Sequence, residues 1–184
     1  MNIVGHHHIS MYTKDAKRNK DFYTNVLGLR LVEKSVNQDN PSMYHLFYGD
    51  EVGTAGTILS FFEIPNAGHK QPGTETIYRF SLLVQGLYSD FVVIEQQGQR
   101  ERPGRGYIHH IAVNTPQMND LDAIYKKLQQ QPQSNSGIID RYFFKSLYYR
   151  HNSIMYEFAT EAPGFTIDTP VEQLGSQLNL PDFL

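Results

Sequence analysis

The chain is built mainly of short runs in which apolar and polar residues alternate, a period that is typical of β-strands with one buried face. In the first part of the chain, strands are expected at residues 6–13, 30–36, 44–48 and 57–64. In the last part, they are expected at residues 108–113, 137–144, 145–150 and 154–160. Pro41-Ser42 and Gly49-Asp50 supply turns between the early strands.

Two stretches repeat apolar residues at helical spacing instead. One follows the first strand, with Asp15 as its N-cap and Gly28 at its end. The other spans about residues 118–130 and begins near Thr115-Pro116. Their apolar faces consist of Phe22, Tyr23 and Val26 in the first helix and of Leu121, Ile124, Tyr125 and Leu128 in the second. Both parts of the chain therefore predict the order β-α-β-β-β.

This order predicts an α+β protein in which paired βαβββ modules form a cupped, barrel-like mixed sheet around a metal site. The first module is expected at residues 1–64 and the second at 107–162. Residues 65–106 form a connecting segment with a hairpin from strands at 77–84 and 90–96, and its arginine-rich end is read as a solvated loop rather than a phosphate site. The tail, residues 163–184, is expected to cover the sheet through its apolar side chains Phe165, Ile167, Leu174, Leu178, Leu180 and Phe183.

The most informative motif is a pair of histidine dipeptides about one hundred residues apart, His7-His8 and His109-His110. The match continues into the following helices, where Phe22 aligns with Ile124 and Tyr23 with Tyr125. A purification-tag remnant does not account for the second dipeptide. A duplicated unit that brings histidines to equivalent places predicts one site shared by two halves.

A carboxylate to complete that site is Glu157, which lies in an apolar strand where an unpaired charge would cost several kcal/mol. A bound metal would remove this cost, and an ion pair with Arg141 or Arg150 is the alternative. Because the chain has no cysteine, a metal site must use nitrogen and oxygen ligands.

The matching strand of the first unit offers no equivalent carboxylate. Aligning Ile58 with Ile154 places Phe61 opposite Glu157, and Glu63 lies roughly 6.6 Å further along the strand. The remaining set is His8, His110 and Glu157. Two imidazoles and one carboxylate with open positions are typical of non-heme Fe(II) sites that use dioxygen. Mn(II), Zn(II) or Ni(II) could occupy the same donors.

Several longer motifs resemble one family. They are residues 27–32 (LGLRLV), 37–50 (NQDNPSMYHLFYGD), 139–148 (IDRYFFKSLY), 163–166 (PGFT) and 178–181 (LNLP). With these motifs the chain resembles the vicinal oxygen chelate superfamily of glyoxalases, bleomycin-resistance proteins and extradiol dioxygenases, and within it the dioxygenases that open hydroquinone rings. Members of that group usually carry four βαβββ modules, and this chain resembles the first and last joined without the middle two.

The resemblance implies that His8, His110 and Glu157 are iron ligands, and that His7, Arg141 and Tyr148 are catalytic groups around them. Arg141 and Tyr148 would stabilise negative charge on the substrate, and His7 would transfer a proton. A structural role for Tyr148 and an ion pair of Arg141 with Asp140 or Glu157 is the alternative.

The expected function is thus a ring-cleaving dioxygenase acting on a small aromatic substrate and O2. The alternatives are a glyoxalase-like isomerase or lyase, for which Glu63 is the obvious fourth ligand, and a protein that sequesters small molecules without turnover. Tyr44 and His45 are expected to be structural. The net charge of −3 argues against nucleic acid, and neither an apolar run nor an N-terminal leader suggests a membrane, so a cytoplasmic location is expected. A homodimer could cover apolar surface.

Overall fold

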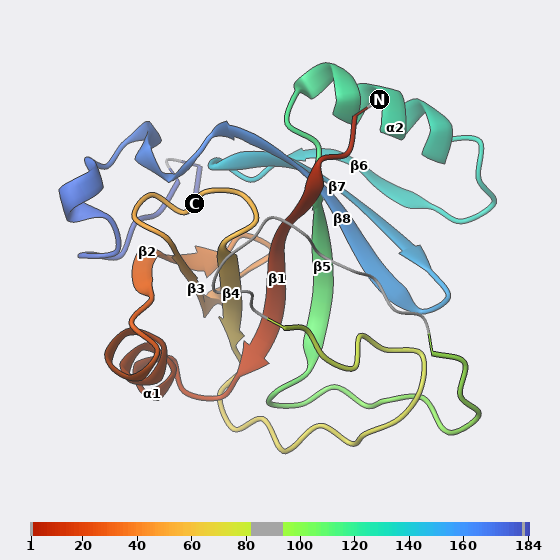
Figure 1. Cartoon of the computed structure of the whole chain (residues 1–184), viewed down its shortest axis with the longest axis horizontal. Coiled ribbons are helices and arrows are strands. Elements are labelled where there is room, and N and C mark those ends of the chain that lie inside the picture. The colour runs from red at the N-terminus through yellow and green to blue at the C-terminus, as the bar shows by residue number, and fades with distance from the viewer. Residues whose placement is uncertain (1, 82–93, 182) are drawn as a thin grey trace.

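The computed structural model describes residues 2–81, 94–181 and 183–184. Its main element is one eight-stranded sheet in the order β2-β3-β4-β1-β5-β8-β7-β6 (Figure 1). The strands are β1 Gly5–Thr13, β2 Arg30–Asn37, β3 Asn40–Gly49, β4 Ile58–Glu63, β5 Ile108–Asn114, β6 Asn135–Asp140, β7 Phe144–His151 and β8 Ile154–Pro163.

The sheet has the symmetry of a duplicated unit. In each half the first strand runs parallel to the last, β1 to β4 and β5 to β8, while the other pairs within each half are antiparallel. The halves join through the antiparallel pair β1 and β5, so the two histidine strands lie side by side at the centre (Figure 1). The prediction of paired βαβββ modules in a cupped mixed sheet is confirmed.

The two outer parts of the sheet approach each other across the cup. Arg141, in the turn after β6, donates two hydrogen bonds to the carboxylate of Asp39, in the turn between β2 and β3, at 3.1 and 2.8 Å. The side-chain amide of Gln38 donates to the Arg141 carbonyl at 3.0 Å. These contacts join residues that are 102 and 103 positions apart and connect the two edges of the curled sheet.

The first helix is shorter than its apolar pattern predicts. Asp15 caps α1 (Ala16–Asp21) by accepting from the Arg18 N–H at 2.9 Å, but a π-helical turn, η1 (Phe22–Val26), follows directly. A π turn is wider than an α turn and moves later residues off the expected face. Consequently Tyr23 packs on Phe61 in the core, whereas Phe22 and Val26 are exposed.

The second helix, α2 (Met118–Leu128), has the predicted buried face. Leu121 and Ile124 are buried against Leu147 of β7, and Tyr125 and Leu128 pack at the edge of the same cluster. In the part of the chain that the structure describes, no helix is long and apolar enough to cross a membrane.

Two expected loop features differ. Pro41-Ser42 lies inside β3, because Gln38-Asp39 form the turn instead. The pairing of β2 with β3 is irregular just beyond that turn, so the missing N–H of Pro41 is tolerated there. The expected hairpin at 77–84 and 90–96 lies largely outside the described residues, and its described ends form no strand. Bridges such as Gln71 to Arg102 join the two ends of the connecting segment.

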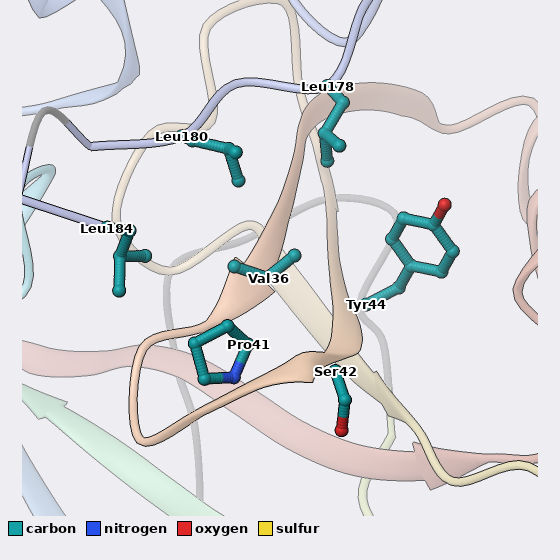
Figure 2. Close-up of a pocket in the computed structure, with 7 residues that line it drawn as sticks. All are labelled: Val36, Pro41, Ser42, Tyr44, Leu178, Leu180 and Leu184. Carbon is teal, nitrogen blue, oxygen red and sulfur yellow. The ribbon is translucent and has the colours of Figure 1, made fainter.

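The tail packs on the sheet through only some of its apolar residues. Phe165 and Leu174 are buried in the second core cluster, but Ile167, Leu178, Leu180 and Phe183 remain 40–60% exposed. Beyond Leu174, the tail and the β2–β3 hairpin form the two sides of an apolar groove of about 350 Å³ (Figure 2). The groove is lined by Val36, Pro41, Ser42, Tyr44, Leu178, Leu180 and Leu184. The tail is therefore a partial cover.

Candidate metal centre

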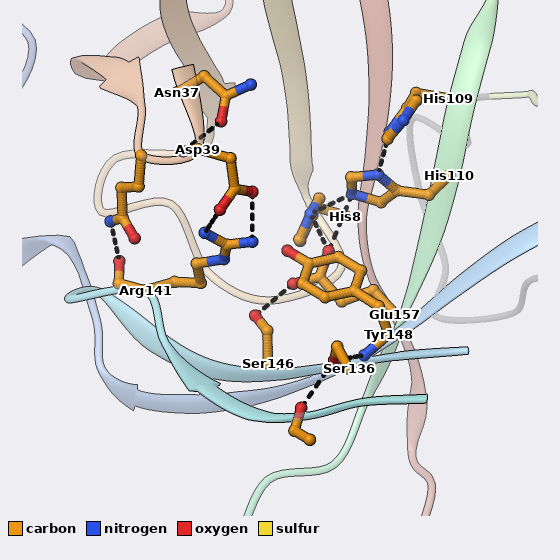
Figure 3. A network of polar contacts seen from close by, with 12 residues as sticks. His8, Asn37, Asp39, His109, His110, Ser136, Arg141, Ser146, Tyr148 and Glu157 are labelled. Carbon is orange, nitrogen blue, oxygen red and sulfur yellow. Dashed lines mark hydrogen bonds and ion pairs between the residues drawn. The ribbon is translucent and has the colours of Figure 1, made fainter. Parts of the chain in front are cut away.

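The two central strands bring His8 and His110 together. In the β1–β5 register Ser10 pairs with His110, and His8 lies two residues from Ser10, so both histidines point to the same face of the sheet. Glu157 of β8 pairs with Ala112 and reaches that face from the other side of β5. The Nε2 atoms of the histidines are 3.2 Å apart, and Glu157 Oε2 lies 3.2 Å from His8 and 2.9 Å from His110 (Figure 3).

These separations fit the donor set of a first-row metal. Metal–nitrogen bonds are about 2.1 Å long, so two ligands at a right angle lie roughly 3.0 Å apart and two at a tetrahedral angle roughly 3.4 Å apart. The separation of 2.9 Å between Glu157 and His110 is close to the first value, and the other two separations, both 3.2 Å, lie midway between the two values. All three side chains are buried, and they are the one such group among the described residues that could hold a metal ion. The geometry therefore suits three ligands of a single metal ion and is compatible with either angle.

Hydrogen bonds determine which ring nitrogen of His8 carries the hydrogen atom in the neutral imidazole. His7 Nε2 lies 3.1 Å from the Thr160 carbonyl, which can only accept, so this nitrogen carries the proton and His7 Nδ1 is an acceptor. His8 Nδ1, 3.0 Å from His7 Nδ1, must then donate. A neutral His8 consequently presents a bare Nε2 lone pair to the Glu157 carboxylate. Two acceptors facing each other at 3.2 Å repel unless a cation or a proton lies between them.

The second half repeats this contact between neighbouring histidines. His109 Nδ1 and His110 Nδ1 are 2.8 Å apart, which leaves His110 Nε2 directed at the triad. Burial lowers the pKa of His110, and it lowers the pKa of both His7 and His109 to about 3. These three rings are therefore neutral, the form in which an imidazole nitrogen can bind a metal.

Glu157 is ionised, and its two carboxylate oxygens have different partners. Burial alone would raise its pKa, but the facing His8 and His110 hold that pKa well below its usual value. The Ser146 hydroxyl donates to Oε1. Oε2 is buried and, apart from the two imidazoles, has no partner among the described residues. This free oxygen is the one directed at the metal position.

Arg141 and Tyr148 lie beside the triad. Tyr148 pairs with Glu157 across β7 and β8, and its ring meets His110 edge-on at 5.8 Å between centroids. Burial and the Glu157 charge raise the pKa of Tyr148, so it is a neutral phenol. The Arg141 guanidinium lies 5.3 Å from the Tyr148 ring centre. Its carboxylate partner is Asp39, and not Asp140 or Glu157 as the alternative interpretation required; Asp140 pairs with Lys145.

The strand register corrects the expected counterpart of Glu157. His8 pairs with Ile58 and His110 with Met155, so Glu157 corresponds to Ser60 and not to Phe61. The shift is one residue, and the conclusion that the first half lacks this carboxylate is unchanged. Ser60 Oγ lies 2.6 Å from Ser10 Oγ in a buried contact.

Glu63, the expected fourth ligand of a glyoxalase-like site, has a different partner. Its Oε1 accepts from the Ala16 N–H at 2.7 Å, at the start of α1. The Glu63 carboxylate therefore binds the N-terminus of α1 and is directed away from the triad.

Sequence reasoning missed the residues that hold the site in place. Asp39 lies within the 37–50 motif, but its partner is 102 positions away. Ser146 shares the face of Tyr148 at a spacing of two, which is a signal that was available in the sequence. The contribution of Thr160 comes from its backbone carbonyl, and side-chain identity cannot reveal it.

Comparisons with known proteins identify relatives of this chain. The chain is 29% identical to a Bacillus subtilis (strain 168) protein named "Putative ring-cleaving dioxygenase MhqA", over 301 aligned positions that cover 100% of this chain and 95% of the relative. Because the alignment is longer than this chain of 184 residues, a long stretch of the relative has no counterpart here. A segment of 68 residues, 36% of this chain and 21% of the relative, is 37% identical to a chlorohydroquinone/hydroquinone 1,2-dioxygenase of Sphingobium indicum.

A similar fold occurs in a solved structure. The crystal structure of a Bacillus subtilis protein described as a "putative dioxygenase" matches with a TM-score of 0.83 at 21% identity, covering 98% of this chain and 92% of that one. A sequence profile matches residues 5–168, which is most of the chain. The protein is therefore a member of the Glyoxalase/Bleomycin resistance protein/Dioxygenase superfamily.

Proposed function

We propose that this protein is an Fe(II)-dependent dioxygenase that cleaves the ring of a small dihydroxylated aromatic substrate with O2. The observation that carries the proposal is the convergence of His8 Nε2, His110 Nε2 and Glu157 Oε2 within 3.2 Å of one another in a buried cup. The similarity to a protein named "Putative ring-cleaving dioxygenase MhqA" and, over 68 residues, to a chlorohydroquinone/hydroquinone 1,2-dioxygenase supports it. When bound, ferrous iron supplies the redox chemistry that allows dioxygen to react with an aromatic ring and leaves positions open for two small reactants.

Arg141 and Tyr148 act on the substrate oxygens in this proposal. The phenol of Tyr148 remains protonated and can donate a hydrogen bond beside the triad. The Asp39 carboxylate orients the guanidinium of Arg141 through two hydrogen bonds, so Arg141 can place positive charge near developing negative charge without reorganisation.

His7 is assigned a positioning role in place of proton transfer. Both of its ring nitrogens are engaged, one by Thr160 and the other by His8, and its pKa of about 3 leaves it unprotonated near neutral pH. It therefore orients His8, keeping the Nε2 lone pair of that ligand directed at the metal position.

The test is reconstitution with Fe(II) under anaerobic conditions, followed by oxygen-electrode measurements with hydroquinones and catechols. We expect oxygen uptake that disappears in Glu157→Ala and after chelation, and parallel reconstitutions with Mn(II), Zn(II) and Ni(II) compare the metals. Glu51→Ala, on an exposed loop, is the matched control. Tight binding of aromatic diols without uptake in any metal form would refute the proposal and favour a sequestering protein.

A glyoxalase-like isomerase is less well supported. That chemistry would use a fourth protein ligand, and the two candidates are engaged elsewhere: Ser60 with Ser10, and Glu63 with the start of α1.

A further inference from the structure

His45 of β3 lies on the inner face of the cup, although its sequence context predicts a structural role. It pairs with Phe62 of β4, which in turn pairs with Tyr12 of β1. Paired residues point to the same face, and alternate residues along a strand share a face. Tyr12 therefore shares its face with His8, so that His45 and the triad face the same interior.

The ring of His45 is held between two aromatic side chains. Its centroid lies 3.9 Å from that of Phe47 and 4.0 Å from that of Phe62, and the Phe62 ring in turn lies 6.4 Å from that of His110. The phenyl rings fix the imidazole plane but offer it no hydrogen-bond partner. They also provide apolar walls of the kind that an aromatic ligand packs against.

The Nε2 atom of His45 is buried and has no hydrogen-bond partner among the described residues. Buried polar side-chain atoms in proteins almost always have one, and an exception requires an explanation. The imidazole is also within electrostatic range of His8, His110, Glu157 and Arg141. An unpartnered nitrogen on the wall of a cup that carries this cluster is the arrangement expected of a ligand-binding group.

The first half of the sheet lacks the carboxylate that the second half presents to the histidines. Glu157 approaches the histidines from the β8 side, whereas its counterpart on β4 is Ser60, which contacts Ser10. No carboxylate ligand is therefore presented from β4, the strand between β1 and β3. His45, on β3, is the next histidine on this side of the triad, one strand beyond β4.

We propose that His45 Nε2 is the hydrogen-bond partner of a substrate oxygen other than the one held at the triad, so that His45 selects aromatic rings that carry two oxygens over rings that carry one. The inference rests on the proposed function, because it takes an aromatic substrate at the triad as given. A neutral imidazole offers one donor and one acceptor, so it can pair with a phenolic hydroxyl in either sense. Burial lowers the pKa of His45 well below its usual value and keeps the ring neutral.

The test compares two ligands that differ by one oxygen, hydroquinone and 4-methylphenol. Dissociation constants are measured by calorimetry on the Zn(II)-loaded protein without oxygen, because zinc has no redox chemistry and turnover is prevented. In His45→Phe, which keeps a ring of similar size, we expect the affinity for hydroquinone to fall about tenfold. The affinity for 4-methylphenol should stay within about twofold of the wild-type value.

Two further variants separate hydrogen bonding from packing. A glutamine amide reaches about as far as Nε2 of histidine and an asparagine amide does not, so His45→Gln should retain most of the hydroquinone affinity and His45→Asn should lose it. His151→Phe, an exposed histidine at the β7–β8 turn, is the matched control and should behave as wild type. Thermal melting and zinc stoichiometry verify that each variant folds and binds metal.

The assignment of His45 would be overturned if His45→Phe weakened the binding of both ligands equally, or if it did not weaken the binding of hydroquinone. If the Phe variant does not fold, the comparison of His45→Gln with His45→Asn answers the same question. Oxygen uptake by the wild-type Fe(II) protein is measured separately. Binding that depends on His45 without any uptake would refute only the proposed function. Uptake combined with binding that is independent of His45 would refute only the present inference.

Discussion

The burial of Glu33, at the contact between the tail and the sheet, provides a quantitative test of the structure. This β2 side chain is 0% exposed, its Oε1 has no partner among the described residues, and Asn179 of the tail donates to its Oε2 at 3.3 Å. Burial raises the pKa of Glu33 from 4.5 to about 8. The hydrogen bonds from Asn179 and from the Lys34 backbone oppose this rise, and the nearby Asp168 adds to it.

The sign of the effect follows from proton binding in the two states. Between pH 4.5 and about 8 the folded protein binds a proton at Glu33 and the unfolded chain does not, so the free energy of unfolding decreases as pH rises. The slope is about 1.36 kcal/mol per pH unit for one group. From pH 5.5 to 7.5 the loss at this site is therefore about 2.7 kcal/mol.

The substitution Glu33→Gln removes the titrating group and keeps its shape. We expect the free energy of unfolding of the variant, relative to wild type, to grow by about 2.7 kcal/mol between pH 5.5 and 7.5. Urea unfolding monitored by circular dichroism, with a chelator present, measures this difference at each pH. Glu51→Gln, on an exposed loop, is the control and should show no such trend. A difference between Glu33→Gln and wild type that is constant with pH would refute the reasoning, since Glu33 would then titrate as it does in the unfolded chain.

Four other measurements test separate parts of the structure. His110→Ala should lose most bound iron by elemental analysis, and full occupancy would show that the ligand assignment is wrong. Asp39→Asn should keep its iron but lower kcat/KM for oxygen uptake by about tenfold or more, because Arg141 loses its orienting carboxylate; an unchanged value would separate Arg141 from catalysis. Gly175→Ala should destabilise the folded protein by several kcal/mol in thermal or urea unfolding, since the added Cβ would lie 2.0 Å from a β2 carbonyl oxygen. Gly28→Ala is the control and should cost only about 1–2 kcal/mol, because Gly28 has a similar positive φ with open space around it. Light scattering over a wide concentration range tests the expected homodimer, which a persistent monomer would contradict.

The parts of the fold that were predicted from the sequence depend on local patterns. Alternation located the eight strands to within a few residues, and the repeat of His7-His8 at His109-His110 correctly implied that two halves share one interior. Each of these signals lies within a short window of sequence. The buried face of α2 was predicted for the same reason, because helical spacing and burial coincide over Leu121 and Ile124.

The features that were not predicted depend on pairing between distant segments. Placing Phe61 in place of Ser60 opposite Glu157 was an error of one residue in strand register, which backbone hydrogen bonds fix and side-chain spacing does not. The Asp39–Arg141 pair joins two turns that meet only because the sheet curls. Neither relation has a signature in a single sequence.

The site is asymmetric although the fold that carries it is nearly symmetric. Two equivalent strands each supply a histidine whose Nδ1 is engaged by its neighbour, so both halves contribute equally to that part of the centre. The halves differ on the flanking strands, where β8 presents Glu157 and β4 presents Ser60. A second carboxylate would add charge and occupy a fourth position, whereas serine leaves that side neutral and open. The presence of serine at this position of β4 therefore leaves three protein ligands at the proposed centre, all of them supplied by β1, β5 and β8.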